Sequence, residues 1–483
     1  MIPAPTISWL AILPLLIVIG TALLVLVADL WMEGPDREAL GWIGLLGLAI
    51  AGIAAIALWN TRASTFSDTV VVDRYGLFFT LLFAVGSGLT LLMSMNYLEQ
   101  TDIHTGDYYA LILFSTVGMV LMATATDLIV IFLGLEVMSI AAYALAGISK
   151  GQLRSNEAAL KYFLLGAFAT GFLLFGIALL YGATASTALG PIAQAVGRAG
   201  VEQRPLVIAG MALLIVGFGF KVAAAPFHVW TPDVYEGAPT AVTAFMAVGI
   251  KAAAFAAFAR VFMHTLAVLS ADWSAVLWML AVLTMTVGNV TALLQRNIKR
   301  MLAYSSIAHA GYVLVGMVSG GELGGSAVLF YLIAYTLMTL GAFTVVIAIG
   351  RRGEPNENLD DYAGVGFRQP FLGVAMLVFM LSLAGIPPLA GFVAKFYIFS
   401  AAVKSGNIGL AVIGVLNSVV SVYYYVGVLV KMYMVEGGVE VARPSSRPYL
   451  FATLLLTVAG TVALGLFPAG LFELARQSFL ALG

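Results

Sequence analysis

Three lysines stand alone in long apolar segments, where a charged side chain needs a physical reason. They are Lys221 in LLIVGFGFKVAAAPF, Lys251 in FMAVGIKAAAFAAF and Lys395 in LAGFVAKFYIF. A carboxylate, Glu136, is similarly placed in DLIVIFLGLEVMSIAAYAL. A charge at the centre of a bilayer costs roughly 2.5–3.5 kcal/mol on insertion scales, so such residues are functional candidates by default. The four residues together predict a path for protons or ions through a membrane.

Two of the lysines lie close to prolines that must interrupt their helices. Pro226 follows Lys221, and Pro387 with Pro388 precedes Lys395. A proline removes one helical hydrogen bond, and in lipid the freed carbonyl oxygens need other partners. Broken helices are therefore expected where the backbone faces protein or a wet cavity. Burial disfavours the charged form of a lysine, so a lysine at such a break can exchange a proton near neutral pH.

Glu136 needs a counter-charge for the same reason. A buried Glu–Lys pair is stable only while both partners are present, and a pair that opens and closes changes the proton affinity of both members. The alternative is a static, structural ion pair. Three lone lysines along one chain favour the functional interpretation.

Three further residues have two interpretations each. Lys161, near a helix end, is either functional or an anchor that reaches the membrane surface. His228, past Lys221 in the expected break, is either a proton relay or a hydrogen-bonded structural residue. His309, in the middle of a helix, either connects the lysines of the two halves or is structural. We expect His104 and His264 to be exposed at the membrane interface. We expect exposed helix caps at three acidic residues, Asp127, Asp233 and Glu236. Three tyrosines are expected to contribute to packing: Tyr423, Tyr424 and Tyr425.

Composition excludes a soluble protein. Of 483 residues, 61% are hydrophobic and only 10% are charged, against about 25% charged residues in soluble domains. The chain has no cysteine, which excludes disulfides and thiolate-bound iron–sulfur clusters. No two of the four histidines share an expected helix, so no haem or metal site is predicted. The net charge of −1 and the lack of a basic, aromatic-rich patch give no sign of nucleic-acid binding.

Apolar segments of spanning length predict an all-α, polytopic membrane protein of about fourteen transmembrane helices. The connections are short, and no soluble domain fits between them. We read the first segment as a spanning helix and not as a signal peptide. The expected spans are 7–31, 40–59, 75–98, 108–125, 128–149, 157–182, 206–232, 239–263, 273–294, 300–319, 325–350, 370–401, 407–434 and 448–475.

The distribution of Lys and Arg in the loops predicts the orientation. Loops after odd-numbered spans carry more of these residues than loops after even-numbered spans. This places both termini on the outer side of the membrane. The richer side holds Arg37, Lys150, Arg154, Arg296, Lys299, Arg300, Arg351, Arg352, Arg368, Lys431, Arg443 and Arg447, and the poorer side Arg62, Arg74, Arg198, Arg204, Arg260, Lys404 and Arg476.

The expected breaks fall in spans seven and twelve. Those two spans run in opposite directions, as two inverted repeats of five helices would require. The order of the lysine and the proline differs between the two breaks. Lys221 precedes Pro226, whereas Lys395 follows the two prolines of its own break. The expected division is an N-terminal three-helix segment (1–106), two repeats (107–264 and 265–435) and a last helix (436–483).

The segments EAALKYFLLGAF, GFKVAAAPFHVWTPDVYEGAPTAVTAFMAVGIKAAAF, NIKRMLAYSSIAHAGYVLVG and LAGIPPLAGFVAKFYIF carry a resemblance. They resemble the antiporter-like membrane subunits of bacterial NADH–quinone oxidoreductase, the respiratory complex I, and among them subunit N. The resemblance covers nearly the whole chain. A lysine in the twelfth helix fits subunits N and L, and the absence of a long lateral helix after residue 475 disfavours subunit L.

This resemblance implies the roles of the four charged residues. Glu136 and Lys221 would form the pair of the first half, Lys251 the link, and Lys395 the site of the second half. It also implies a proton-translocating subunit of the bacterial cytoplasmic membrane without a redox centre of its own. NADH, FMN, iron–sulfur clusters and quinone would act in partner subunits, and neighbouring antiporter-like subunits and lipid would surround the chain.

Two other classes compete with this hypothesis. Antiporter subunits of cation/proton exchange complexes share the lysine constellation, so these motifs discriminate poorly between the two. A purely structural membrane spacer would not need buried lysines, whose cost argues against it.

Overall fold

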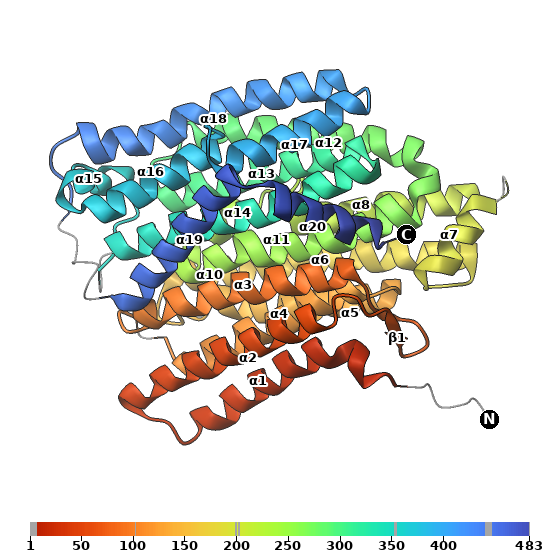
Figure 1. Ribbon diagram of the computed structural model, residues 1–483, viewed down its shortest axis with the longest axis horizontal. Coiled ribbons are helices and arrows are strands. Elements are labelled where there is room, and N and C mark those ends of the chain that lie inside the picture. Colours follow the sequence, from red (N-terminus) through yellow and green to blue (C-terminus); the bar gives the residue numbers. More distant parts are fainter. Residues whose placement is uncertain are drawn as a thin grey trace.

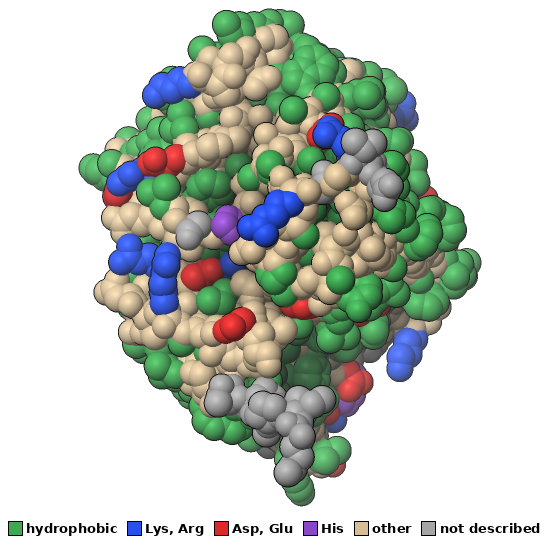
Figure 2. Space-filling view, turned by 90° about the vertical axis from the view of Figure 1, so that its right-hand side faces the viewer, with side chains coloured by type: hydrophobic (Ala, Val, Ile, Leu, Met, Phe, Trp, Pro, Cys, Tyr) green, Lys and Arg blue, Asp and Glu red, His purple; other side chains and the backbone are tan. Residues whose placement is uncertain are grey.

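A computed structural model describes residues 7–101, 103–198, 200, 203–351, 355–439 and 447–482. Its helices lie side by side and run along the horizontal direction of Figure 1, as expected for a bundle that spans a membrane. The described ends of the chain lie at the same end of the bundle (Figure 1). Figure 2 looks onto that end, where charged side chains are scattered over a surface of backbone and uncharged side chains.

Within the described residues, thirteen helices are long and apolar enough to cross a membrane. Backbone groups in lipid must be satisfied within the segment, which a helix does for every interior residue. These spans are α1 (Leu13–Asp29, after a 3-10 turn at Trp9–Ile12), α2 (Glu38–Ala57), α3 (Arg74–Leu98), α4 (Thr105–Thr124), α5 (Leu128–Ala146), α6 (Leu153–Thr184), α8 (Arg204–Val222), the continuous helix Thr240–Thr265, α12 (Ser270–Ala292), α13 (Ile298–Ser319), α14 (Gly321–Ile349), α18 (Ile408–Met434) and α19 (Pro448–Leu466).

The expected twelfth span is present as two half-helices, α16 (Pro370–Ala384) and α17 (Ala390–Lys404), with the two prolines between them. The expected seventh span is likewise interrupted: α8 is followed by the short helix α9 (Thr231–Gly237). Both breaks occur where the prolines predicted them. The membrane-protein fold and the two broken helices are therefore confirmed.

The helix Thr240–Thr265 forms the centre of the bundle. It consists of α10 (Thr240–Phe245) and α11 (Lys251–Ala259), joined by a π-helical turn at Met246–Ile250 and extended by another at Arg260–Thr265. Every residue in the most apolar stretch of this helix is buried inside the bundle. In the corresponding stretch of α19, only 28% of the residues are buried. Lys251 therefore lies in the part of the bundle that is farthest from lipid.

Close helix packing relies on glycine. A Cβ atom on Gly118 of α4 would lie 2.4 Å from the main-chain nitrogen of Met138 and 2.5 Å from the carbonyl oxygen of Gly134, both on α5. No side chain fits between these backbones, as is common where small residues line a membrane interface. Gly118 thus fixes the distance between α4 and the helix that carries Glu136.

Several connections hold elements that the apolar pattern did not predict. A hairpin of β1 (Ala63–Thr65) and β2 (Val70–Val72) pairs Ala63 with Val72, and an isolated bridge joins Val70 to Ala125. The last expected span, 448–475, was too long, because α19 ends at Leu466 before Pro468. The remaining short helices are α7 (Leu189–Arg198), α15 (Val365–Arg368), α20 (Ala469–Leu480) and the 3-10 turns Gly34–Arg37, Ala267–Leu269 and Leu359–Tyr362.

The structure describes all but two of the Lys and Arg residues from which the orientation is predicted. Arg352 and Arg443 lie outside the described residues. Because the described chain begins and ends at one end of the bundle, the expectation that both termini share a side agrees with the fold (Figure 1). Which side of the membrane that is stays a prediction.

Candidate functional site

Lys221 lies in the last turn of α8. The helix ends there because Ala223 adopts a left-handed conformation, with φ of 60°, and Pro226 follows. The Lys221 side chain is buried, and its Nζ donates hydrogen bonds to the hydroxyls of Ser139 (2.7 Å) and Tyr143 (3.1 Å) on α5. The break thus holds the lysine against the face of α5.

Glu136 shares that face of α5, because residues three and seven positions further on, Ser139 and Tyr143, lie above it on the helix. Its carboxylate acts electrostatically on both Lys221 and Tyr143. No ion pair joins Glu136 to any of the described residues, and its Oε1 is buried without a hydrogen-bond partner among them. Glu136 and Lys221 are therefore neighbours that do not touch in this structure.

Aromatic rings enclose the Lys221 ammonium group. Its Nζ lies 5.2 Å from the ring centre of Tyr143, 5.6 Å from Tyr162 and 5.8 Å from Phe220. The Tyr162 ring also stacks on Trp230, with the two ring centres 4.5 Å apart. Because the faces of aromatic rings attract cations, this enclosure compensates in part for the loss of water around the charge.

Lys251 faces α13 from the centre of the bundle. Its Nζ donates to the carbonyl oxygen of Ser306 at 2.7 Å and to the hydroxyl of the same residue. The side chains of Lys251 and Ser306 are both buried. Serine beside a buried ammonium is chemically suited to pass a proton, because its hydroxyl both donates and accepts.

His309 lies one turn further along α13, between two tyrosine hydroxyls. Its Nδ1 is 2.6 Å from the hydroxyl of Tyr331, and its Nε2 is 3.0 Å from that of Tyr425. The charges of both Lys251 and Lys395 act on the buried imidazole. His309 is therefore near enough to both lysines for their charges to act on it, and its connecting role stays a prediction.

Lys395 is held by the end of the half-helix before it. Its Nζ donates to the carbonyl oxygens of Leu383 (2.9 Å) and Ala384 (3.0 Å) and to the hydroxyl of Ser418 on α18 (2.8 Å). Helix C-termini carry free carbonyls and a partial negative charge, which favour a cation. The Nζ also lies 5.0 Å from the ring centre of Tyr312. The proline break thus creates the polar surroundings that a lysine at this depth requires.

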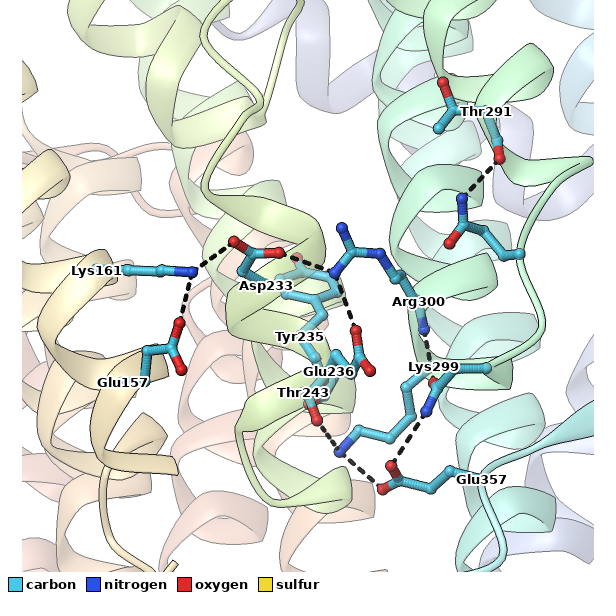
Figure 3. Close-up of polar contacts among 12 residues, drawn as sticks. Glu157, Lys161, Asp233, Tyr235, Glu236, Thr243, Thr291, Lys299, Arg300 and Glu357 are labelled. Carbon is cyan, nitrogen blue, oxygen red and sulfur yellow. Dashed lines mark hydrogen bonds and ion pairs between the residues drawn. The ribbon is translucent and has the colours of Figure 1, made fainter. Parts of the chain in front are cut away.

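Lys161 belongs to a different group of charges, at the opposite end of the bundle from the described chain ends. Its Nζ lies 2.7 Å from carboxylate oxygens of both Glu157 and Asp233 (Figure 3). Arg300 of α13 joins the same Asp233 at 2.8 Å and Glu236 at 2.9 Å. The network ties α6 and α13 to α9, the short helix after the first break. Lys161 is thus one member of an ion-pair network, and the choice between its two interpretations stays a prediction.

The network also corrects an expectation about Asp233 and Glu236. They do not act as exposed helix caps, because both are partly buried and carry ion pairs. Burial raises the pKa of Asp233, but hydrogen bonds from Lys161 and Arg300 outweigh this effect and place the pKa below its usual value. The third expected cap, Asp127, does cap α5 through the main-chain N–H of Ile129 at 2.8 Å, but it is buried.

A cavity of about 790 Å³ opens at the same end of the bundle as this network. It is lined by loop residues that include Lys150, Arg351 and Glu357. In its wall the buried Lys299 pairs with Glu357 at 3.0 Å and donates to the carbonyl oxygens of Glu236 (2.9 Å) and Ala238 (2.7 Å). The cavity reaches the first residues of the helix that carries Lys251, since Thr240 is among its lining residues.

The remaining histidines are less closely tied to the lysines. His228 lies in the first break, and its Nδ1 is buried without a partner among the described residues. No hydrogen bond connects it to Lys221 in the part of the chain that the structure describes. His104 and His264 are exposed, as expected.

Sequence reasoning missed the tyrosines that hold His309. Tyr425 was interpreted as packing, yet its hydroxyl also lies 2.5 Å from that of Ser305. The packing interpretation does not fit Tyr423, whose side chain is 74% exposed. No local signal in the sequence singles out Tyr425 or Tyr331, because their contacts with His309 depend on the packing of α14 and α18 against α13. Among the described residues, no three His, Asp or Glu side chains converge to hold a metal ion.

Comparison with known proteins identifies the family. A family model described as "NADH:quinone oxidoreductase/Mrp antiporter, TM" matches residues 125–421. NADH-quinone oxidoreductase subunit N of Trichlorobacter lovleyi is 51% identical over 464 residues, which cover 96% of this chain and 95% of that protein.

Solved structures agree with this match. A chain of respiratory complex I from Thermus thermophilus with bound aureothin is 36% identical and superposes with a TM-score of 0.80, over 96% of this chain and 99% of that one. A chain of the Mrp complex from Dietzia sp. is 22% identical with a TM-score of 0.84, over 98% of this chain and 97% of that one, which shows a shared fold. The chain therefore belongs to the family of NADH–quinone oxidoreductase subunit N.

Proposed function

We propose that this chain is a proton-translocating membrane subunit of a bacterial NADH–quinone oxidoreductase, the respiratory complex I. It acts as a non-redox part of the translocase, while NADH, FMN, iron–sulfur clusters and quinone act in partner subunits. It lies in the cytoplasmic membrane with both termini on the outer side. Its neighbours are other antiporter-like membrane subunits and lipid.

One observation carries this proposal. Buried groups able to exchange protons follow one another through the apolar interior, from Lys251 through Ser306 and His309 to the surroundings of Lys395. Each such group is costly in a membrane interior. A spacer between other subunits would not need them, whereas a proton path does.

The proposed cycle starts at Glu136 and Lys221. A signal from a neighbouring subunit changes the distance between the two side chains and with it the proton affinity of Lys221. The proton then passes by way of water to Lys251. It continues through Ser306 and His309 to Lys395 and leaves on the outer side. Protons from the inner side reload the lysines.

The two inverted repeats are part of the proposal, and the helix breaks support it. Ala223 and Gly385 both end their half-helices in a left-handed conformation, with φ of 60° and 89°. Each donates its N–H to the carbonyl oxygens three and four residues earlier. Each precedes a proline, Pro226 or Pro388, by three positions. The first break thus has the same local construction as the second. The proposed units are 1–106, 107–264, 265–435 and 436–483.

The test is to separate electron transfer from proton transfer in the assembled complex. NADH oxidation and proton uptake are measured together in liposomes that contain the complex with Lys395→Ala. Retained quinone reduction with a reduced number of protons per electron supports the proposal. An unchanged proton yield would contradict it.

The family model also covers Mrp antiporters, which keeps a second function open. In that case the chain would exchange protons for another cation, driven by gradients alone. Liposomes containing the complex separate the two functions. Exchange of sodium for protons without NADH would support the antiporter, and its absence under conditions of active NADH-driven pumping would exclude it.

A further inference from the structure

The outer end of the Lys251 helix holds a buried ion pair that the proposed path does not use. Arg260 donates through two nitrogens to the Asp73 carboxylate, at 2.9 Å and 3.1 Å, and also to the carbonyl oxygen of Ala123 at 2.8 Å. The side chains of Arg260 and Asp73 are 3% and 7% exposed. This geometry is the strong, two-point form of a guanidinium–carboxylate contact.

Neighbouring groups fix both partners in place. Asp73 caps α3, since its Oδ1 accepts the N–H of Gly76 at 2.6 Å. The guanidinium carbon of Arg260 lies 4.9 Å from the ring centre of Tyr75, and the Tyr75 hydroxyl donates to the carbonyl oxygen of Ala256 at 2.8 Å. The pair therefore joins the N-terminal three-helix segment to the central helix. The other titratable group that acts on it is the exposed His264, which follows on the same helix.

The position of the pair along the helix is informative. Lys251 and Arg260 are nine residues apart, about 13.5 Å at 1.5 Å per residue. The residues between them, AAAFAAFA, are all apolar and buried. At the other end of the helix Thr240 lines the open cavity. The ten residues between Thr240 and Lys251 are buried as well. In the outward direction, Lys251 is followed by an apolar, buried segment that ends at Arg260.

We propose that the buried Arg260–Asp73 pair seals the outer end of the Lys251 helix against protons, so that a proton on Lys251 leaves toward His309 and not directly outward. This inference rests on the proposed function and deepens it. Arg260 is a positioning residue here and does not carry the proton.

The chemistry of the pair explains why it seals. A guanidinium does not release its proton under any physiological condition, so Arg260 cannot relay one. Both oxygens of Asp73 accept hydrogen bonds from Arg260, so neither is free to receive a proton from another group. Fixed positive charge in a narrow passage also opposes the entry of protons, as in other membrane pores. Without Arg260, Asp73 would be a buried, unpaired carboxylate, which binds a proton readily and can pass it on.

The two partners are therefore expected to differ when they are removed singly. Arg260→Gln leaves a carboxylate that can shuttle protons, whereas Asp73→Asn leaves a cation that still repels them. A merely structural pair would give no such asymmetry, because removing either partner of a buried ion pair is destabilising. The double variant Arg260→Gln with Asp73→Asn has neither charge and no relay group.

The experiment measures passive proton entry into liposomes that contain the whole complex, without NADH. A potassium diffusion potential drives the protons, and a pH-sensitive dye inside reports them. We expect Arg260→Gln to speed proton entry several-fold, and Asp73→Asn and the double variant to stay near the unmodified complex. The control is Arg204→Gln, which breaks an exposed pair with Asp272 (3.4 Å) on the same outer side.

Each outcome decides the proposal. Equal leaks in Arg260→Gln and Asp73→Asn, or no leak in an assembled Arg260→Gln complex, would overturn it. If Arg260→Gln does not assemble, Arg260→Met gives the same test, because it nearly keeps the length of the side chain and also leaves Asp73 without its cation. In that variant a leak supports the seal and an unmodified rate overturns it. Because no turnover is needed, a failed seal stays distinguishable from a failed pump, which the Lys395 variants test.

Discussion

Glu136 and Lys221 face each other from α5 and α8 without forming an ion pair, because Ser139 and Tyr143 hold the lysine. The carboxylate is left with one buried oxygen unpartnered among the described residues. Such a group is costly unless water or another partner reaches it. The arrangement is one of two states that the proposed cycle requires, the one in which the pair is open.

The first prediction concerns coupling between these two residues. Glu136→Gln and Lys221→Met should each stall pumping, because each removes one side of the same switch. The double variant should lose little more than the worse single variant, since both changes act on one step. Glu136→Asp should be milder, because it keeps the charge. Pumping and quinone reductase activity of all four variants in the same membranes provide the measurement. Strictly additive losses, or a fully active Glu136→Gln complex, would show that the two residues are not one switch.

The second prediction concerns the charge type at Lys395. Lys395→Arg should impair pumping although it keeps the positive charge, since a guanidinium hardly deprotonates. Lys395→Ala should assemble and pump less. The exposed Lys404, at the end of the same half-helix, is the matched control, and Lys404→Arg should be neutral. Protons per electron in liposomes distinguish these cases, and normal pumping by Lys395→Arg would exclude a deprotonation step there.

The third prediction tests the tyrosine beside His309. Tyr425→Phe keeps the ring and its packing but removes the hydroxyl that contacts both His309 and Ser305. It should lower the pumping rate with little effect on assembly. Tyr423→Phe, at an exposed position of the same helix, is the control. Equal pumping in the two variants would remove Tyr425 from the path.

The fourth prediction concerns the packing of α4 on α5. Gly118→Ala places a methyl group 2.4 Å from a backbone nitrogen, so the helices must separate. Such overpacking costs typically about 1–3 kcal/mol. Gly171→Ala, where nothing lies within 4 Å of the added carbon, should be neutral or stabilising. Thermal stability of the detergent-solubilised complex is the measurement. If the two variants melt at the same temperature, the close approach does not limit stability.

The sequence predicted the spans and both breaks, because hydropathy and proline act locally. It did not predict the half-helix α20 after Pro468, since the apolar pattern continues past that proline. Nor did it predict the hairpin at Ala63–Val72, whose strands are three residues long. Short strands give no periodic signal, and their pairing depends on the helices around them.

The candidate site was predicted in part for similar reasons. Lys221, Lys251, Lys395 and His309 were identifiable because charge in an apolar segment is costly. Their partners were not, since a serine or tyrosine in a membrane helix costs little and is common. The ion pair of Arg260 with Asp73 joins residues 187 positions apart, and only the packing of α3 against the central helix brings them together.

The three hydrogen-bond partners of Lys395 have a consequence for its proton. An ammonium group has three hydrogens to donate, and here they meet two carbonyl oxygens and one hydroxyl. A neutral amine has two hydrogens and one lone pair. The carbonyls of Leu383 and Ala384 can only accept, whereas the Ser418 hydroxyl can turn and donate to the lone pair. Both charge states therefore fit the same positions of the heavy atoms. Lys395 can bind and release a proton without any movement of the half-helices α16 and α17.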